Sequence, residues 1–106
     1  MKRMLMVGLG LLLAACGVTL APVTPALLGE AQRHFPDTTE AELLHGQATL
    51  RTKCTQCHGL RDPRAYDEKA WTFYVGEMSA RATLTSAEKQ ALLRYVLVAR
   101  SASMPP

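Results

Sequence analysis

Hydrophobic positions recur at helical spacing through the second half of the chain. One apolar face, at positions i, i+3, i+4 and i+7, consists of Trp71, Tyr74, Val75 and Met78. Asp67 precedes this pattern as a helix cap with Glu68 in the first turn, and residues 81–83 are expected to end the helix. The pattern therefore predicts an amphipathic helix between these two points.

Two further helices are expected, one on each side of this one. Thr85 and Glu88 have the spacing of a capping box, which predicts a helix that runs to about Arg100. Its inward positions are Ala91, Leu92, Tyr95, Val96 and Ala99. Upstream, Asp37 and Glu40 have similar spacing, so a helix capped by Asp37 is expected to run on to the cysteine pair described below. The chain is therefore predicted to be all-α, with about three helices.

The longest apolar run stands at residues 4–15 and indicates export. Lys2 and Arg3 precede it, and its length fits a signal-peptide core of roughly 7–15 residues but not a bilayer span of roughly 20. It ends in Leu13-Ala14-Ala15-Cys16, which resembles the lipobox of bacterial lipoprotein signals. The resemblance implies that residues 1–15 are removed and that Cys16 is acylated. An uncleaved helical anchor and an ordinary signal peptide with a chance cysteine are the alternatives.

Residues 16–30 are expected to form a lipidated N-terminus and a flexible tether. The stretch contains Pro22 and Pro25 and has no charge before Glu30, and proline favours extended backbone. Because Leu27 and Leu28 are apolar, an arm packed on the domain is the alternative. The folded domain is expected at residues 31–106, exported and held at a membrane, where it faces the periplasm or the cell exterior.

Size and charge limit the function classes. The chain has 106 residues, enough for one small domain, and a formal net charge of +3. Without Lys2 and Arg3 the twelve basic residues become ten against nine acidic ones, a net charge of +1. A chain so balanced has no basic patch that would favour nucleic acid. Of three cysteines, acylation would use Cys16 and leave a pair.

That pair lies in Cys54-Thr55-Gln56-Cys57-His58, the pattern for covalent attachment of one haem c. Two thiols three positions apart can form thioethers to the two vinyl groups, and the following His58 is then the proximal iron ligand. A thioredoxin-like pair would need a βαβ context, and a zinc site would need a second pair of ligands. A structural disulfide or redox pair is the remaining alternative.

The sequence around the motif resembles class I cytochromes c. The stretch Gly46-Gln47-Ala48-Thr49-Leu50-Arg51-Thr52-Lys53-Cys54 is similar to the Gly-x-x-x-aromatic-x-x-x-Cys that opens that family's motif, with Leu50 in place of the aromatic. The resemblance covers about residues 37–100. It implies a small cytochrome c fold of about three helices around one haem, with the glycine allowing the N- and C-terminal helices to cross closely. Trp71 and Tyr74 are then expected to line the haem pocket, although a helix–helix seam would give the same pattern.

The sixth iron ligand is expected to be Met78, a role that rests on the same resemblance. In that family a methionine between the motif and the C-terminal helix fills this position, and Met78 has that place in chain order. Met104, followed by two prolines, is the rival, and His34 and His45 are weaker candidates. A five-coordinate iron, with Met78 as a flexible core residue, is the remaining alternative.

The expected function is one-electron transfer by a membrane-tethered monohaem cytochrome, not an enzyme in its own right. Ligation by His58 and Met78 closes the iron to substrates, and methionine raises the reduction potential. The partners would be other redox proteins, and the chain could act alone or as the haem subunit of a larger oxidoreductase. The alternatives are a gas-binding or catalytic haem protein with an open sixth position, and a haem-free lipoprotein with a Cys54–Cys57 disulfide.

Overall fold

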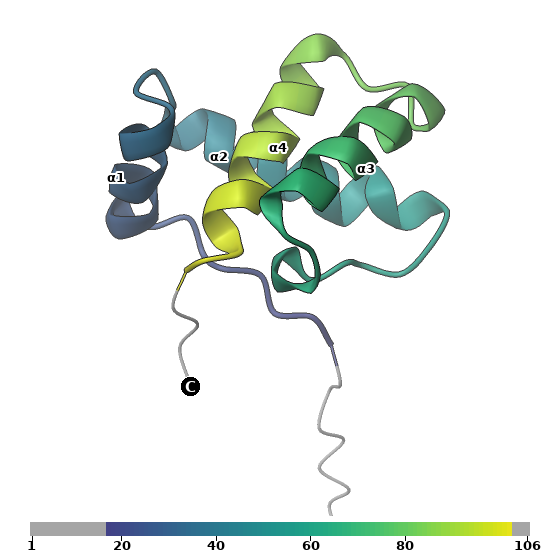
Figure 1. Ribbon diagram of the computed structural model, residues 1–106, viewed down its shortest axis with the longest axis horizontal. Coiled ribbons are helices and arrows are strands. Elements are labelled where there is room, and N and C mark those ends of the chain that lie inside the picture. Colours follow the sequence, from purple (N-terminus) through teal and green to yellow (C-terminus); the bar gives the residue numbers. More distant parts are fainter. Residues whose placement is uncertain (1–16, 103–106) are drawn as a thin grey trace, which may run out of the picture.

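The computed structural model of the chain describes residues 17–102, and all regular structure within this range is helical. Its helices are α1 (Pro25–His34), α2 (Glu40–Thr52), α3 (Glu68–Arg81) and α4 (Ser86–Ala99), with short 3-10 turns η1 (Cys54–Gln56) and η2 (Pro63–Ala65) (Figure 1). The predicted all-α class is confirmed. The predicted signal peptide, the acylated Cys16 and the rival ligand Met104 lie outside the described residues.

Local capping sets the start of α3 and of α4. The Asp67 carboxylate accepts a hydrogen bond from the backbone N–H of Ala70 at 2.8 Å, so α3 begins at Glu68 as predicted. At α4 the Thr85 hydroxyl accepts from the N–H of Glu88, and the Glu88 carboxylate accepts from the N–H of Thr85, both at 3.1 Å. Both predicted caps are confirmed.

The predicted cap of α2 was wrong. Thr39, not Asp37, accepts from the backbone N–H of Glu42 at 3.1 Å, and the helix begins at Glu40. Asp37 instead forms an ion pair with Arg94 on α4 at 3.1 Å, and Glu42 forms another with the same guanidinium at the same distance. The Asp37 carboxylate is thus engaged with a distant charged partner and not with the helix backbone.

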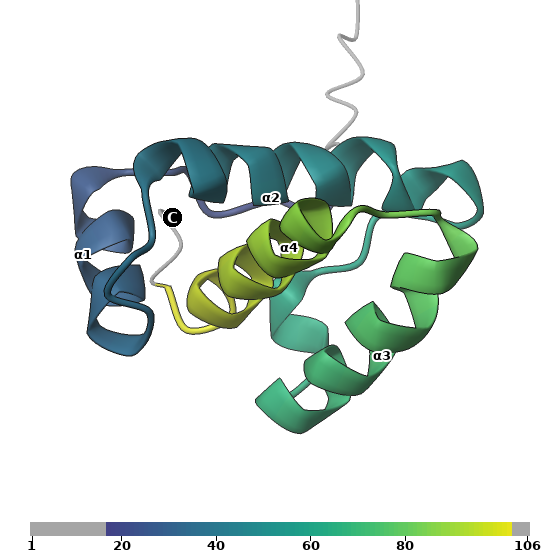
Figure 2. The same ribbon diagram turned by 90° about the horizontal axis from the view of Figure 1, so that it is seen from above.

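The central packing contact is the crossing of α2 over α4 at Gly46 (Figure 2). A Cβ atom built on Gly46 would overlap the carbonyl oxygen of Ala91 and lie 2.8 Å from the Cβ of Tyr95. Only glycine permits this approach, because any side chain would force the two backbones apart. The inward residues predicted for α4, Ala91 and Tyr95 among them, are all buried, and Val98 joins them. The close crossing implied by the family resemblance is present.

Helix α3 packs on the other side of α4, opposite α1, as Figures 1 and 2 both show. Trp71 and Val75 are almost completely buried in this contact. The indole N–H of Trp71 donates to the carbonyl oxygen of Pro63 at 2.7 Å, which joins the helix to the loop before it. Burying an indole requires such a partner for its N–H group.

The N-terminal segment does not form the predicted flexible tether. Residues 18–24, here called the strap, run from α1 across the lower edge of the domain in Figure 1, and only 4% of Leu20 and 3% of Ala21 are exposed. The tether prediction is therefore wrong for these residues, and the packed arm is correct. The prolines suit the arrangement, because Pro22 lies outside regular structure and Pro25 occupies the first turn of α1, where no N–H is needed.

Helix α1 was not expected at all. Thr24 caps it by accepting from the N–H of Leu27 at 3.1 Å, and Leu27 and Ala31 turn inward to the core. The turn that follows is held by Arg94, whose guanidinium lies 5.1 Å from the ring centroid of Phe35. The domain therefore begins before residue 31, with α1 as a fourth helix.

Candidate functional site

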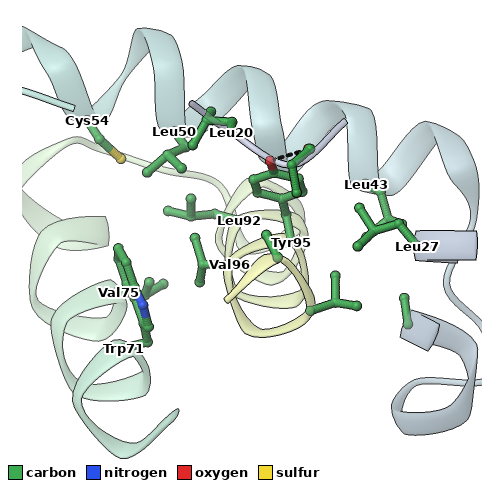
Figure 3. Close-up of a cluster of buried hydrophobic side chains, with 14 residues drawn as sticks. Leu20, Leu27, Leu43, Leu50, Cys54, Trp71, Val75, Leu92, Tyr95 and Val96 are labelled. Carbon is green, nitrogen blue, oxygen red and sulfur yellow. Dashed lines mark hydrogen bonds between the residues drawn. The ribbon is translucent and has the colours of Figure 1, made fainter. Parts of the chain in front are cut away.

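The two motif cysteines stand directly after α2, in different environments. Cys54 begins the turn η1 and is 8% exposed, whereas Cys57 ends the turn and is exposed. Both thiols are free, so the structure holds no Cys54–Cys57 disulfide. In Figure 3 the Cys54 sulfur points from the end of α2 towards Leu50 and Leu92. One thiol of the pair therefore faces the core and the other faces solvent.

Burial raises the pKa of the Cys54 thiol, because a thiolate would lose its hydration in this apolar setting. A redox-active Cys-x-x-Cys pair needs the reverse, a thiolate stabilised by positive charge or a helix N-terminus. Cys54 lies at a helix C-terminus, where the backbone dipole disfavours negative charge. Cys54 therefore lacks the surroundings of a reactive thiolate.

His58 is half-buried, and its Nδ1 lies 2.7 Å from the carbonyl oxygen of Gly59. With a proton on Nδ1, this contact is a hydrogen bond donated to the carbonyl, and the lone pair of Nε2 is then available to a metal. Histidines that bind metals are commonly oriented in this way, by donation of the other ring N–H to a backbone carbonyl. The ring geometry thus suits the predicted role of His58.

The loop after the motif is fixed at both ends of η2. The carboxylate of Asp62 accepts from the backbone N–H of Arg64 at 2.9 Å and pairs with its guanidinium at 2.9 Å, and this hydrogen-bonded partner lowers the pKa of Asp62. Besides the bond from Trp71 to Pro63, the Arg100 Nε–H donates to the carbonyl oxygen of Tyr66 at 3.2 Å. Helices α3 and α4 therefore both hold the loop that carries the chain away from His58.

The inner face of α3 is narrower than predicted. Trp71 and Val75 are buried, and Met78 is half-buried with its side chain against the same core. Tyr74, however, is 41% exposed and packs at the surface against Tyr66, with ring centroids 4.9 Å apart. Placing Tyr74 on the inner face was wrong, because a helix of 3.6 residues per turn turns this position past the edge of the seam.

Cys54 and the inner face of α3 belong to one apolar cluster. Figure 3 shows Cys54 on one side, Trp71 and Val75 on another, and Leu92 between them, and Met78 packs against the same cluster. The structure thus brings together the buried thiol and the methionine-bearing helix. It also buries Trp71 between α3 and α4, with its indole N–H bound to the Pro63 carbonyl of the preceding loop.

The other predicted ligand candidates lie on the surface. His34 is the last residue of α1, where its Nε2 lies 3.4 Å from the Glu30 carboxylate, and His45 is exposed on α2. His34 thus belongs to a helix that the sequence did not predict. Within residues 17–102, no three side chains of His, Cys, Asp or Glu converge as ligands of a single metal ion.

Two contributors to the site were missed from the sequence. The Pro63 carbonyl accepts the bond from the Trp71 indole, whereas an Asp-Pro pair in a sequence indicates only a turn. Tyr95 was assigned to the core, but its hydroxyl donates to the carbonyl oxygen of Ala21 in the strap at 2.7 Å. A tyrosine among aliphatic inward positions was the available signal, since a buried phenol needs a hydrogen-bond partner.

Comparison of the chain with protein-family models, with curated proteins and with solved structures found no match. In the part of the chain that the structure describes, no helix has the length and the apolar character needed to cross a membrane.

Proposed function

We propose that the protein is a membrane-anchored monohaem c-type cytochrome that transfers single electrons. The observation that carries the proposal is the motif's position: Cys54 directly follows a helix that crosses α4 closely at Gly46, as the resemblance to class I cytochromes c implies. A Cys-x-x-Cys-His pattern alone can arise by chance, and the close crossing eight residues before Cys54 is a second, independent feature that supports the proposal.

The donor groups of the site fit a haem c. Cys54 and Cys57 are both free to form thioethers, and the Nδ1 contact of His58 leaves Nε2 available as the proximal ligand. The bound haem would supply the one-electron couple. The chain itself supplies an apolar cluster on one side, which excludes water, and an exposed Cys57 on the other, where a partner could approach.

Met78 is proposed as the sixth ligand. It lies on the face of α3 that carries Trp71 and Val75, and it packs against the cluster that contains Cys54. Its thioether would favour the ferrous state and keep the iron closed to gases and substrates. The chain then needs no acid–base residue, which agrees with a carrier that performs no substrate chemistry.

The first test is covalent attachment of haem. The full chain is expressed with a cytochrome c maturation system, and a haem stain is applied to a boiled denaturing gel. We expect a stained band for the native chain and for the control Cys16→Ala, and none when both Cys54→Ala and Cys57→Ala are present. A native chain that carries no stain would reject the cytochrome in favour of the haem-free alternative.

The second test separates a methionine ligand from a methionine that only fills the core. Met78→Leu conserves side-chain volume but removes the sulfur, so the packing of α3 should survive. We expect loss of the weak sulfur-to-iron charge-transfer band of the ferric protein, and new binding of carbon monoxide by the ferrous protein. An unchanged spectrum would reject Met78. A high-spin, carbon monoxide-binding native protein would favour the open-site alternative.

A further inference from the structure

The strap is held by three linked hydrogen bonds, of which one is buried and two are partly buried. The Tyr95 hydroxyl donates to the carbonyl oxygen of Ala21 at 2.7 Å, and the Gln47 side-chain amide donates to the same oxygen at 3.1 Å and to the Tyr95 hydroxyl at 3.2 Å. Tyr95 is completely buried, and Leu20 enters the core beside it. Two helices, α2 and α4, therefore fasten the strap at one point of the backbone.

This fastening point lies close to Cys16 in the sequence. Only Gly17, Val18 and Thr19 separate Cys16 from Leu20, and Val18 itself packs against the core. At about 3.5 Å per residue, four steps give a reach of about 14 Å, against about 50 Å for a free tether of fifteen residues. The packed strap thus removes most of the freedom that the sequence alone suggested.

We propose that the strap holds the domain directly against the lipid surface, so that the bilayer is the docking partner of the edge where the strap begins. This inference rests on the proposed acylation of Cys16. Acyl chains buried in the bilayer keep Cys16 at its surface. The reach of about 14 Å from Cys16 to Leu20 is shorter than the diameter of a small domain. The lower edge in Figure 1, where the strap and the last turn of α4 lie, then faces the lipid.

The contact does not depend on lipid charge. Without residues 1–15 the chain has a net charge of +1, too small to need an anionic membrane. The covalent anchor supplies the affinity, and the strap supplies the orientation. Electron partners would accordingly be proteins embedded in, or bound to, the same membrane surface, because the domain cannot swing away from it.

The test uses the haem-loaded, acylated protein in vesicles of phosphatidylethanolamine and phosphatidylglycerol, treated with elastase. A protease needs an extended segment of accessible chain, and the packed strap does not offer one. We expect the native domain to remain with the vesicles after sedimentation. Leu20→Asp should detach the strap and release the domain at least ten times faster, whereas Leu44→Asp, at an exposed position of α2, should behave as the native chain does.

A second measurement covers the case in which Leu20→Asp disturbs folding. Neutron reflectometry on a supported bilayer of the same lipids gives the thickness of the water layer beneath the domain. We expect no separate layer for the native chain, and a layer of about 20 Å after insertion of twelve Gly/Ser residues behind Gly17, from the root-mean-square length of such a linker. An equal layer for both chains would overturn the strap proposal.

Failure of the anchor and failure of the strap give different results. A haem-stained protein that is soluble, or whose mature N-terminus is not an acylated Cys16, would reject the anchor and with it this inference. An acylated native protein that elastase releases as fast as Leu20→Asp would reject the strap alone. Neither result bears on haem attachment, which the gel stain decides independently.

Discussion

The helix crossing and the strap differ in how far they could be predicted from the sequence. At the crossing, Gly46 lies eight residues before Cys54, so the stretch that leads into the motif also carries the glycine that permits the approach to Ala91 on α4. At the strap, the backbone of Ala21 binds Tyr95, 74 residues away. The first region could be recognised from the sequence and the second could not. The difference shows that the N-terminal segment of this small domain is built from long-range contacts.

The largest expected effect tests the crossing. Gly46→Ala places a methyl group against the carbonyl of Ala91, so α2 and α4 must separate. We expect a loss of about 3 kcal/mol in the free energy of unfolding, measured by urea denaturation, because overpacking at a rigid backbone outweighs the better helix propensity of alanine.

Gly29→Ala is the matched control in the other region. A Cβ on Gly29, in α1, meets nothing within 4 Å. We expect this change to be neutral or to stabilise by up to about 1 kcal/mol, since alanine is the better helix former. Equal losses in the two variants would break the comparison, because the crossing would then be no tighter than the N-terminal helix.

The next effect concerns the loop after the motif. Trp71→Phe removes the donor to the carbonyl of Pro63 and leaves that buried oxygen without its partner. We expect a loss of about 2 kcal/mol in the free energy of unfolding. Hydrogen exchange in residues 59–66 should also become faster. Phe73→Leu, at an exposed neighbouring position, should change stability by less than about 0.5 kcal/mol. If the two variants were equally stable, the Trp71 bond would not hold the loop.

Tyr95→Phe tests the strap with a smaller change. It removes one hydroxyl and leaves the Gln47 bond to Ala21 in place, so we expect a loss of about 1 kcal/mol in urea denaturation. Tyr74→Phe, at the surface, should have no measurable effect. A neutral result for Tyr95→Phe would mean that Leu20 and the Gln47 bond hold the strap without the Tyr95 hydroxyl.

The same hydroxyl predicts a dependence on alkaline pH. Burial raises the pKa of the Tyr95 phenol above its unfolded value, so the folded chain keeps a proton that the unfolded chain releases. Its contribution is complete below the unfolded pKa of about 10 and is lost as the pH rises through the folded pKa. Urea denaturation above pH 10 should therefore show a steeper fall for the native chain than for Tyr95→Phe. Parallel curves would contradict this.

The helix starts that the sequence predicted correctly are those whose caps bind neighbouring residues. The caps Asp67 and Thr85 bind backbone three residues away, so local pattern was enough to place α3 and the start of α4. The cap of α2 was misplaced because Asp37 and Thr39 both stand three residues before a glutamate. In the structure Asp37 pairs with Arg94, and Thr39 caps the helix. No local rule contains that partner.

Part of the candidate site could also be predicted from the sequence and part could not. The positions of Cys54, Cys57 and His58 follow from a five-residue motif, and the buried face of Trp71 and Val75 follows from helical spacing. The outward turn of Tyr74 did not follow, because the width of the apolar face depends on how α3 meets α4. A heptad-like pattern gives the centre of a seam more reliably than its edges.

The smallest expected effect is a coupling free energy between two positions on α4, the capped N-terminus and the residue that holds the strap. The helix N-terminus is set locally by the capping box, and Tyr95, ten residues on, holds the strap. Thr85→Ala should cost about 1 kcal/mol in urea denaturation, and Ser86→Ala, exposed beside it, less than about 0.5 kcal/mol. The backbone N–H of Thr85 is the main cause that lowers the pKa of Glu88. The stability that this bond gives is present above the unfolded pKa and is lost as the pH falls through the folded one, a loss that Glu88→Gln should abolish.

The double variant Thr85→Ala, Tyr95→Phe measures this coupling free energy. Ten residues of helix separate the two positions by about 15 Å, a distance at which the two losses should add within about 0.5 kcal/mol. Additivity would mean that the locally specified start of α4 and the long-range strap stabilise the domain separately. A larger coupling would mean that the strap helps to hold the whole of α4, because loosening one end of the helix would then weaken the other. In that case the capped start of α4 and the strap would not contribute separately to the free energy of unfolding, although one is specified locally and the other by distant residues.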